Sequence, residues 1–245
     1  MIDVHVHVGH FKDGLYFSPE EVAQDMKTLN LERYYFSSTS TGSIPFRYVR
    51  RQIEELIALS NGKAIPLLWV SPGMLQHSRN LECYFFRDFA GIKIHGHQGW
   101  KPYGTEIRRI LSIAREKNLP VMLHTGGTDE CDAGAYMNLC REFYDVRIIL
   151  AHGRPVAQTI EVMNECPNAW ADTAFMPTSD ILELKKSGLV SHVLWGTDFP
   201  VMRYFYKTPV RKYYEKRIKE VLKILEYGDF EKITRKNFNL FGFYS

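Results

Sequence analysis

The sequence predicts an α/β fold, a single (β/α)8 barrel of the TIM-barrel type. The chain has 245 residues, of which 45% are hydrophobic and 24% charged, which is typical of one globular domain with a large core. Short β-branched or aromatic runs alternate with longer segments of helical period, as expected for parallel strands joined by crossover helices. Eight such runs in about 250 residues match the rhythm of the barrel. No linker or internal repeat divides residues 1–245, so one domain is expected.

The strands are predicted from apolar runs that are bounded by turn residues or helix signals. The eight candidates are residues 2–8, 33–39, 64–70, 91–95, 120–124, 147–152, 169–173 and 192–197.

The helices are predicted from apolar residues at helical spacing and from their end signals. The clearest start is SPEE at 18–21, where Ser18 can cap, Pro19 fits the first helical position and Glu21 completes a capping box. This helix is expected to end near Asn30. The other predicted helices are residues 46–62, 105–118, 156–166 and 179–188.

The first strand, IDVHVHVGH at 2–10, places histidines on alternate positions of an apolar run. Because successive side chains of a strand point to opposite faces, His5 and His7 are expected to share a face with Asp3. Two imidazoles on one rigid strand face can bind one metal ion. Asp3 is expected either to orient a histidine or to make a buried hydrogen bond.

Further polar residues stand where later strands end. His95 ends the fourth predicted strand, His124 the fifth and His152 the sixth, and Asp198 follows the eighth. Catalytic residues of (β/α)8 barrels lie at the carboxyl ends of the strands. These side chains are therefore expected to meet His5 and His7 at one rim of the barrel.

Composition excludes several classes of function. The formal charge of +3 is small and the basic residues are interleaved with acidic ones, which argues against nucleic acid as a partner. No apolar run has the roughly 20 residues of a membrane span, and the start lacks the features of a signal peptide. A cytoplasmic protein with a small-molecule substrate is expected. The four cysteines lack metal or disulfide spacing and are expected to be buried thiols: Cys83, Cys131, Cys140 and Cys166.

Taken in order along the chain, these motifs resemble the amidohydrolase superfamily, specifically its amidohydrolase 2 branch, which is related to aminocarboxymuconate semialdehyde decarboxylase. The matching pieces are DVHVHVG, GIKIH, PVMLHTG, IILAHGR, GTDFP and EKITRKNFNLFGF (231–243), the last as a closing helix. The resemblance implies a metal-dependent TIM-barrel hydrolase. It implies His5, His7, His124 and Asp198 as ligands of a divalent metal, with His152 close by.

Three histidines and a carboxylate suit zinc best, with manganese or iron as alternatives. A bound divalent cation lowers the pKa of water from 15.7 to roughly 7. Asp198 is then expected to serve as both ligand and proton acceptor. His152 is expected either to polarise the substrate carbonyl and hold the oxyanion, or to make an ordinary hydrogen bond.

Five residues are candidates for contacts with substrate. Lys93 shares a strand face with His95 and is expected to be a buried ammonium, a donor to substrate, or a carbamate that bridges two metals, as in some superfamily members. His97 belongs to the loop 95–104, which is expected over the mouth of the barrel. Arg154 and Arg203 follow strand ends and can bind a substrate carboxylate through two parallel hydrogen bonds.

Several functions stay open at this stage. The first is hydrolysis of an amide, lactone or ester. The second is metal-dependent, non-oxidative decarboxylation, and the third is a phosphodiesterase of the TatD type, against which the GIKIH strand argues. A metal-binding protein without enzymatic activity is the last. A homodimer is also expected, with the aromatic segment 201–214 as a candidate interface.

Overall fold

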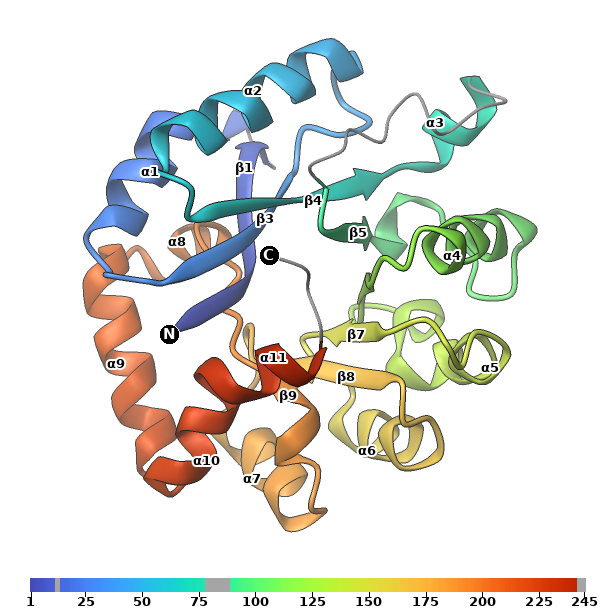
Figure 1. Ribbon diagram of the computed structural model, residues 1–245, viewed down its shortest axis with the longest axis vertical. Coiled ribbons are helices and arrows are strands. Elements are labelled where there is room, and N and C mark those ends of the chain that lie inside the picture. The colour runs from blue at the N-terminus through green and yellow to red at the C-terminus, as the bar shows by residue number, and fades with distance from the viewer. Residues whose placement is uncertain (12–13, 78–88, 242–245) are drawn as a thin grey trace.

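The computed structural model describes residues 1–11, 14–77 and 89–241, and it confirms the predicted TIM-barrel fold. One sheet of nine strands runs in the order β2-β1-β3-β4-β5-β6-β7-β8-β9, with helices arranged around it (Figure 1). The strands are β1 Ile2–His10, β2 Tyr16–Phe17, β3 Arg33–Ser38, β4 Ala64–Val70, β5 Gly91–Ile94, β6 Val121–His124, β7 Ile148–Ala151, β8 Ala169–Asp172 and β9 Val193–Leu194.

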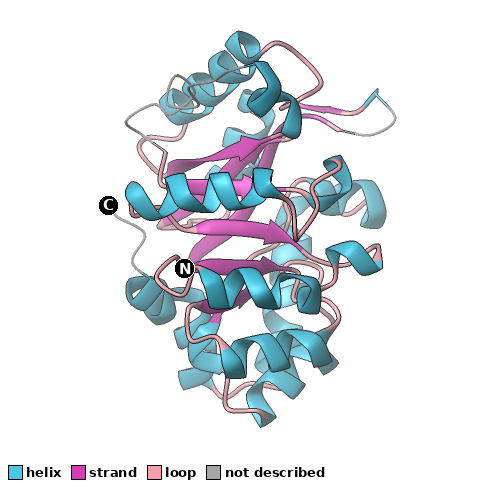
Figure 2. Cartoon of the chain, turned by 90° about the vertical axis from the view of Figure 1, so that its right-hand side faces the viewer, coloured by secondary structure: helices cyan, strands magenta, loops and turns pink. Residues whose placement is uncertain are grey.

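All eight predicted strands are present. The sequence did not predict β2, which pairs antiparallel with the end of β1, because two residues are too few to show a period. Every other pair of neighbouring strands is parallel, as crossover helices require. The side view shows the strands running through the middle of the molecule with helices outside them (Figure 2).

The ring of strands closes between β1 and the segment that follows β9. The amide of Val4 donates to the carbonyl of Trp195 at 2.9 Å, and the amide of Asp198 donates to the carbonyl of His5 at 2.9 Å. The predicted strand 192–197 is therefore regularly paired only over β9. The residues after β9 are joined to β1 by single hydrogen bonds. This closure brings Asp198 beside the histidines of β1.

The helices alternate with the strands. They are α1 Pro19–Lys27, α2 Phe46–Leu59, α3 Pro72–His77, α4 Thr105–Glu116, α5 Met137–Glu142, α6 Val156–Glu165, α7 Thr178–Lys186, α8 Val201–Tyr206, α9 Val210–Leu222, α10 Tyr227–Glu231 and α11 Asn237–Phe241. Short 3-10 turns are η3 Gly96–Gln98, η4 Asp129–Cys131, η5 Ala133–Tyr136 and η6 Val190–His192. Among the described residues, no helix is long and apolar enough to cross a bilayer.

The predicted helices are confirmed within a few residues at their ends. The Ser18 side chain accepts from the amide of Glu21 at 3.2 Å, as the capping signal predicted. The closing helix consists of α10, the π-helical turn η7 Lys232–Lys236 and α11, and residues 242–243 of that prediction lie outside the described residues. Cys131, Cys140 and Cys166 are buried free thiols, as predicted, whereas Cys83 lies outside the described residues.

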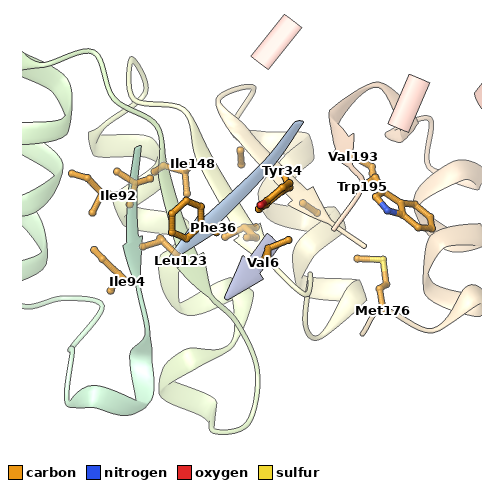
Figure 3. Close-up of a cluster of buried hydrophobic side chains, with 14 of the residues drawn as sticks. Val6, Tyr34, Phe36, Ile92, Ile94, Leu123, Ile148, Met176, Val193 and Trp195 are labelled. Carbon is orange, nitrogen blue, oxygen red and sulfur yellow. The ribbon is translucent and has the colours of Figure 1, made fainter. Parts of the chain in front are cut away.

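Two apolar clusters determine where a polar site can lie. The larger one fills the layer between strands and helices, and Figure 3 shows part of it, including Val6, Phe36 and Ile92. The smaller one lies inside the barrel and includes Val4, Tyr35 and Met122 from the strands and Phe238 from α11. Because this cluster fills one end of the barrel, the carboxyl ends of the strands are left for polar residues.

Candidate metal centre

A bulge in β1 determines which of its side chains point into the barrel. The pairing of β1 with β3 shifts register between Asp3 and Val6, and an inserted residue of this kind reverses the alternation of faces. Val4 accordingly packs in the cluster inside the barrel, whereas Val6 packs in the outer one. The expectation that Asp3 shares a face with His5 and His7 is therefore wrong. Its carboxylate accepts hydrogen bonds from Thr197 and from Tyr214 of α9.

His5, His7 and Asp198 converge inside the barrel, as predicted from the sequence. Oδ1 of Asp198 lies 2.8 Å from Nε2 of His7 and 3.5 Å from Nε2 of His5. All three residues are buried. Burial raises the pKa of Asp198, but the neighbouring His5 and His7 outweigh it and hold that pKa well below its usual value, so the carboxylate is ionised.

The outer nitrogens of both imidazoles are fixed by oxygen acceptors. Nδ1 of His5 donates to Oδ2 of Asp172 at 2.8 Å, and Nδ1 of His7 lies 3.1 Å from the hydroxyl and 3.3 Å from the carbonyl of Ser37. A neutral imidazole carries one proton. Nε2 of His5 therefore presents a lone pair toward Asp198, and Nε2 of His7 lies within hydrogen-bond distance of Oδ1.

Asp172 is a site residue that sequence reasoning missed. It ends β8 and is fully buried, and besides His5 it accepts hydrogen bonds from the amides of His152 and Ala174. The sequence does indicate it, because Asp172 lies at the end of the predicted strand AWADT, just as His95, His124 and His152 lie at the ends of their predicted strands.

His152 follows β7 and is held in a defined orientation. Its Nδ1 donates to the carbonyl of Ala174 at 3.0 Å, and its Nε2 lies 3.2 Å from Nδ1 of His124. Because Nδ1 carries the proton of neutral His152, Nδ1 of His124 is the donor of that second bond. His152 and Asp198 both have positive φ, 72° and 59°, a conformation that non-glycine residues adopt at a cost and that often marks functional sites.

His124 lies beside the group of His5, His7 and Asp198, against a second group of histidines. Ligand nitrogens of His95, His97 and His124 lie within 4.8 Å of one another. The rings of His95 and His124, however, are stacked at 3.9 Å with an angle of 17° between their planes. An ion between two stacked rings would lie outside both ring planes, so this second group binds an ion only after one ring has turned.

Lys93 is buried in the middle of the site. Its Nζ donates to Nε2 of His5 at 3.3 Å. Burial lowers the pKa of Lys93 to about 8, against the opposing attraction of Asp172 and Asp198. Lys93 and a cation would compete for the same lone pair of His5.

The remaining substrate-binding candidates lie in different places. His97 donates from Nε2 to the carbonyl of Gly126 at 3.2 Å, and Arg154 donates to the carbonyl of Phe175 at 3.0 Å. Both side chains pack on the Gly126–Gly127 turn after β6. Arg203 instead forms ion pairs with Glu21 and Asp25 of α1, so the structure does not bring it to the histidines.

The residues at the site fit a divalent cation. Oδ1 of Asp198 is buried and accepts no hydrogen bond of good geometry from the described residues, although Nε2 of His7 is close. Two imidazole nitrogens and an ionised carboxylate oxygen, all within 4.8 Å of one another, form a donor set that a divalent cation can bind in place of a proton.

The fold and these motifs agree with a sequence comparison. The family model for amidohydrolases of the amidohydrolase 2 group matches residues 78–237, which is more than half of the chain. The chain therefore belongs to the amidohydrolase 2 family, which confirms the resemblance seen in its motifs. No curated protein matches the sequence significantly.

Solved structures of similar fold cover nearly the whole chain. A probable 2-pyrone-4,6-dicarboxylic acid hydrolase from Acinetobacter baumannii with bound citric acid is 15% identical, with a TM-score of 0.68 over 99% of both chains. A zinc-bound amidohydrolase from Burkholderia multivorans is 11% identical, with a TM-score of 0.69 over 98% of this chain and 97% of that one. A dihydroxybenzoic acid decarboxylase from Polaromonas, crystallised with manganese and an inhibitor, is 13% identical, with a TM-score of 0.66 over 98% and 96%. At these identities the likeness shows the fold alone.

Proposed function

We propose that the protein is a metal-dependent hydrolase that cleaves an amide, lactone or ester bond in a small molecule. The observation that carries this proposal is the convergence of His5, His7 and Asp198, in which Oδ1 of Asp198 lies 2.8 Å from Nε2 of His7 and 3.5 Å from Nε2 of His5. A bound divalent cation, zinc by preference and manganese or iron as alternatives, would supply activated water there. Bound zinc and manganese in two structures of similar fold support this choice.

The proposed ligands are His5, His7, His124 and Asp198. His5 and His7 contribute Nε2 lone pairs from a rigid strand. His124 donates from Nδ1 to His152, which leaves a lone pair on its Nε2. Asp198 also accepts the proton of the attacking water and passes it to the leaving group.

His152 is proposed to stabilise the negative charge that develops on the substrate carbonyl. Burial lowers the pKa of His152, so it is neutral before the reaction and its only proton is on Nδ1. Nε2 must therefore take up a proton from solvent, which makes His152 an imidazolium, before it can donate to an oxyanion.

Lys93, His95, His97 and Arg154 are proposed to bind the substrate. With the His5 lone pair engaged by a bound cation, the Lys93 ammonium would be free to donate to a substrate oxygen. Arg154 has no carboxylate partner among the described residues and borders the site through Phe175, so it suits a substrate carboxylate. We leave Arg203 out of the proposed site because α1 already holds its guanidinium.

Metal content tests the proposal most directly. Protein purified without added metal is analysed for the wild type and for His5→Ala, His124→Ala and Asp198→Ala, with His192→Ala as control because His192 packs on Trp170. About one equivalent that is lost or loosened in the three variants but kept in the control is expected. No metal after reconstitution would refute the proposal, and two equivalents would support a carbamate on Lys93.

Decarboxylation of a small carboxylic acid is the second candidate. It is supported by the Polaromonas decarboxylase, which matches with nearly the same TM-score as the hydrolase from Acinetobacter. Incubation of the metal-loaded protein with lactones, amides and aromatic carboxylates separates the two reactions. Carbon dioxide release identifies a decarboxylase, whereas ring opening or acid release without it identifies a hydrolase. The family match favours both over the TatD-type phosphodiesterase.

A further inference from the structure

The loop after β8 accepts hydrogen bonds from basic side chains along its whole length. This loop, residues 173–176, is called the clamp loop here. Each of its four carbonyls has such a donor: Arg217 bonds Thr173 at 3.3 Å and also Met176, His152 bonds Ala174 at 3.0 Å, and Arg154 bonds Phe175 at 3.0 Å. The loop also forms backbone bonds of its own, since the amide of Met176 donates to the carbonyl of Thr173 and the amide of Thr173 to that of Leu194. The basic side chains add to these bonds and orient the carbonyls of the loop.

Arg217 holds the clamp loop from outside the barrel. It lies on α9, far from the site in sequence, and is 8% exposed. One NH2 group bonds the first and the last carbonyl of the loop, whereas the nearest carboxylate, that of Glu220, is 3.8 Å from NH1. Two carbonyls thus accept from one nitrogen of this buried guanidinium.

The carbonyl that orients His152 lies between the two carbonyls that Arg217 fixes. Ala174 accepts from Nδ1 of His152, and its own amide donates to Asp172. On the other side of the loop, Phe175 has a positive φ of 51°, a conformation that a phenylalanine keeps only where its surroundings impose it. The position of the Ala174 carbonyl therefore depends on the contacts of Arg217.

We propose that Arg217 is a positioning residue that keeps the proton of His152 on Nδ1, and hence its lone pair on Nε2, by fixing the clamp loop. The importance of this role for catalysis rests on the proposed function, in which His152 acts through Nε2. A hydrogen bond of 3.0 Å is largely lost when its acceptor moves by about 1 Å. Without Arg217 the Ala174 carbonyl shifts, and the two tautomers of His152 approach equal energy.

Nitrogen-15 NMR of the histidine side chains, on the protein before metal is added, reads this effect without a substrate. The His152 signals are assigned by their loss in His152→Gln. In the wild type, Nδ1 is expected to be protonated and Nε2 to be bare. In Arg217→Met, signals averaged between both tautomers are expected. Arg211→Met is the matched control, because Arg211 lies on the same helix but is exposed and paired with Glu215.

An unchanged His152 tautomer in Arg217→Met, in protein that binds zinc and has a native circular dichroism spectrum, would overturn the proposal. If this variant does not fold, Arg217→Gln replaces it, since a glutamine side chain is polar but two bonds shorter and does not reach both carbonyls. Averaged signals in Arg217→Gln support the proposal and wild-type signals contradict it. Zinc uptake, measured afterwards on the same samples, tests the proposed function separately from the tautomer.

Discussion

At the scale of single residues, the site is defined by the outer nitrogens of its imidazoles. Nδ1 of His5 and of His152 donates to Asp172 and Ala174, and Nδ1 of His7 contacts the hydroxyl and carbonyl oxygens of Ser37. Partners of this kind choose the tautomer of a histidine and orient its ring. The inward Nε2 atoms are thus oriented before any ligand binds.

Asp172→Asn is expected to weaken metal binding by about 10- to 100-fold, the usual effect of losing such a partner. The amide group of asparagine would face Nδ1 of His5 and favour the tautomer whose Nε2 carries the proton, which cannot bind a cation. Competition with a chromophoric chelator measures the affinity. Asp145→Asn is the control, because Asp145 pairs with Arg115 at the surface. Equal affinities for wild type and Asp172→Asn would contradict this role of Asp172.

The sequence predicts the residues of the site better than their surroundings. His5 and His7 could be identified because they follow the bulge of β1 and still share one strand face. Asp198 could be identified because it directly follows a predicted strand. The strand face of Asp3 was predicted wrongly, because the amino-acid sequence of a strand does not show where a β-bulge lies. The contacts of Arg217 with the clamp loop could not be predicted either, since they join two elements whose packing depends on the finished barrel.

At the scale of elements, the turns after the strands position the side chains at the rim. The turn after β6 shows this clearly. A Cβ on Gly127 would lie 2.6 Å from the ring of His97, so only glycine lets that histidine approach the backbone.

Gly127→Ala is therefore expected to cost more stability than Gly188→Ala. Both glycines have positive φ, 94° and 74°, but a Cβ on Gly188 would meet no atom within 4 Å. The shared backbone strain is about 1–2 kcal/mol, and displacement of His97 adds about 1–3 kcal/mol in the first variant alone. Urea unfolding of both variants gives the difference. Equal losses would show that His97 moves aside freely.

Length explains which elements the sequence predicted. Most long helices and the strands with several apolar residues were found, because each contains enough residues to show a period. The 13-residue helix α9 was not predicted, since tyrosines and charged residues fill most of its positions. The strand β2 and the 3-10 turns were not, since two to four residues carry no such pattern. The closing helix was found as one segment, but its π-helical turn was not.

At the scale of the whole molecule, the barrel depends on contacts between its first and last strands. Asp3 of β1 and Thr197, which are 194 residues apart, are joined by a hydrogen bond of 2.6 Å, and Tyr214 of α9 donates to the same carboxylate. Burial raises the pKa of Asp3 to about 7, although Thr197 and Tyr214 lower it.

The expected homodimer stays a prediction. Within its candidate interface, the segment 201–214, the side chain of Phe205 is 60% exposed.

Asp3→Asn is expected to remove a pH dependence of stability from the metal-free protein. With a raised pKa, Asp3 binds its proton more tightly in the folded state, so the wild type loses stability as pH rises from about 4 to 7. The upper limit of this change is about 4 kcal/mol, from 1.36 kcal/mol per pKa unit. Asparagine can accept the same backbone hydrogen bonds and donate to the two hydroxyl groups. Urea unfolding with chelator at pH 5 and pH 8 compares the two proteins, and parallel pH curves would refute this effect.

The closure of the barrel also determines when a cation can be captured during biosynthesis. His5 and His7 leave the ribosome before the rest of the barrel, whereas Asp198 follows only after most of it has been made. A nascent chain that ends before β9 contains the two proposed ligands of β1 but not Asp198. We therefore expect the complete site to form late in the maturation of the protein, after the last strand has joined the first.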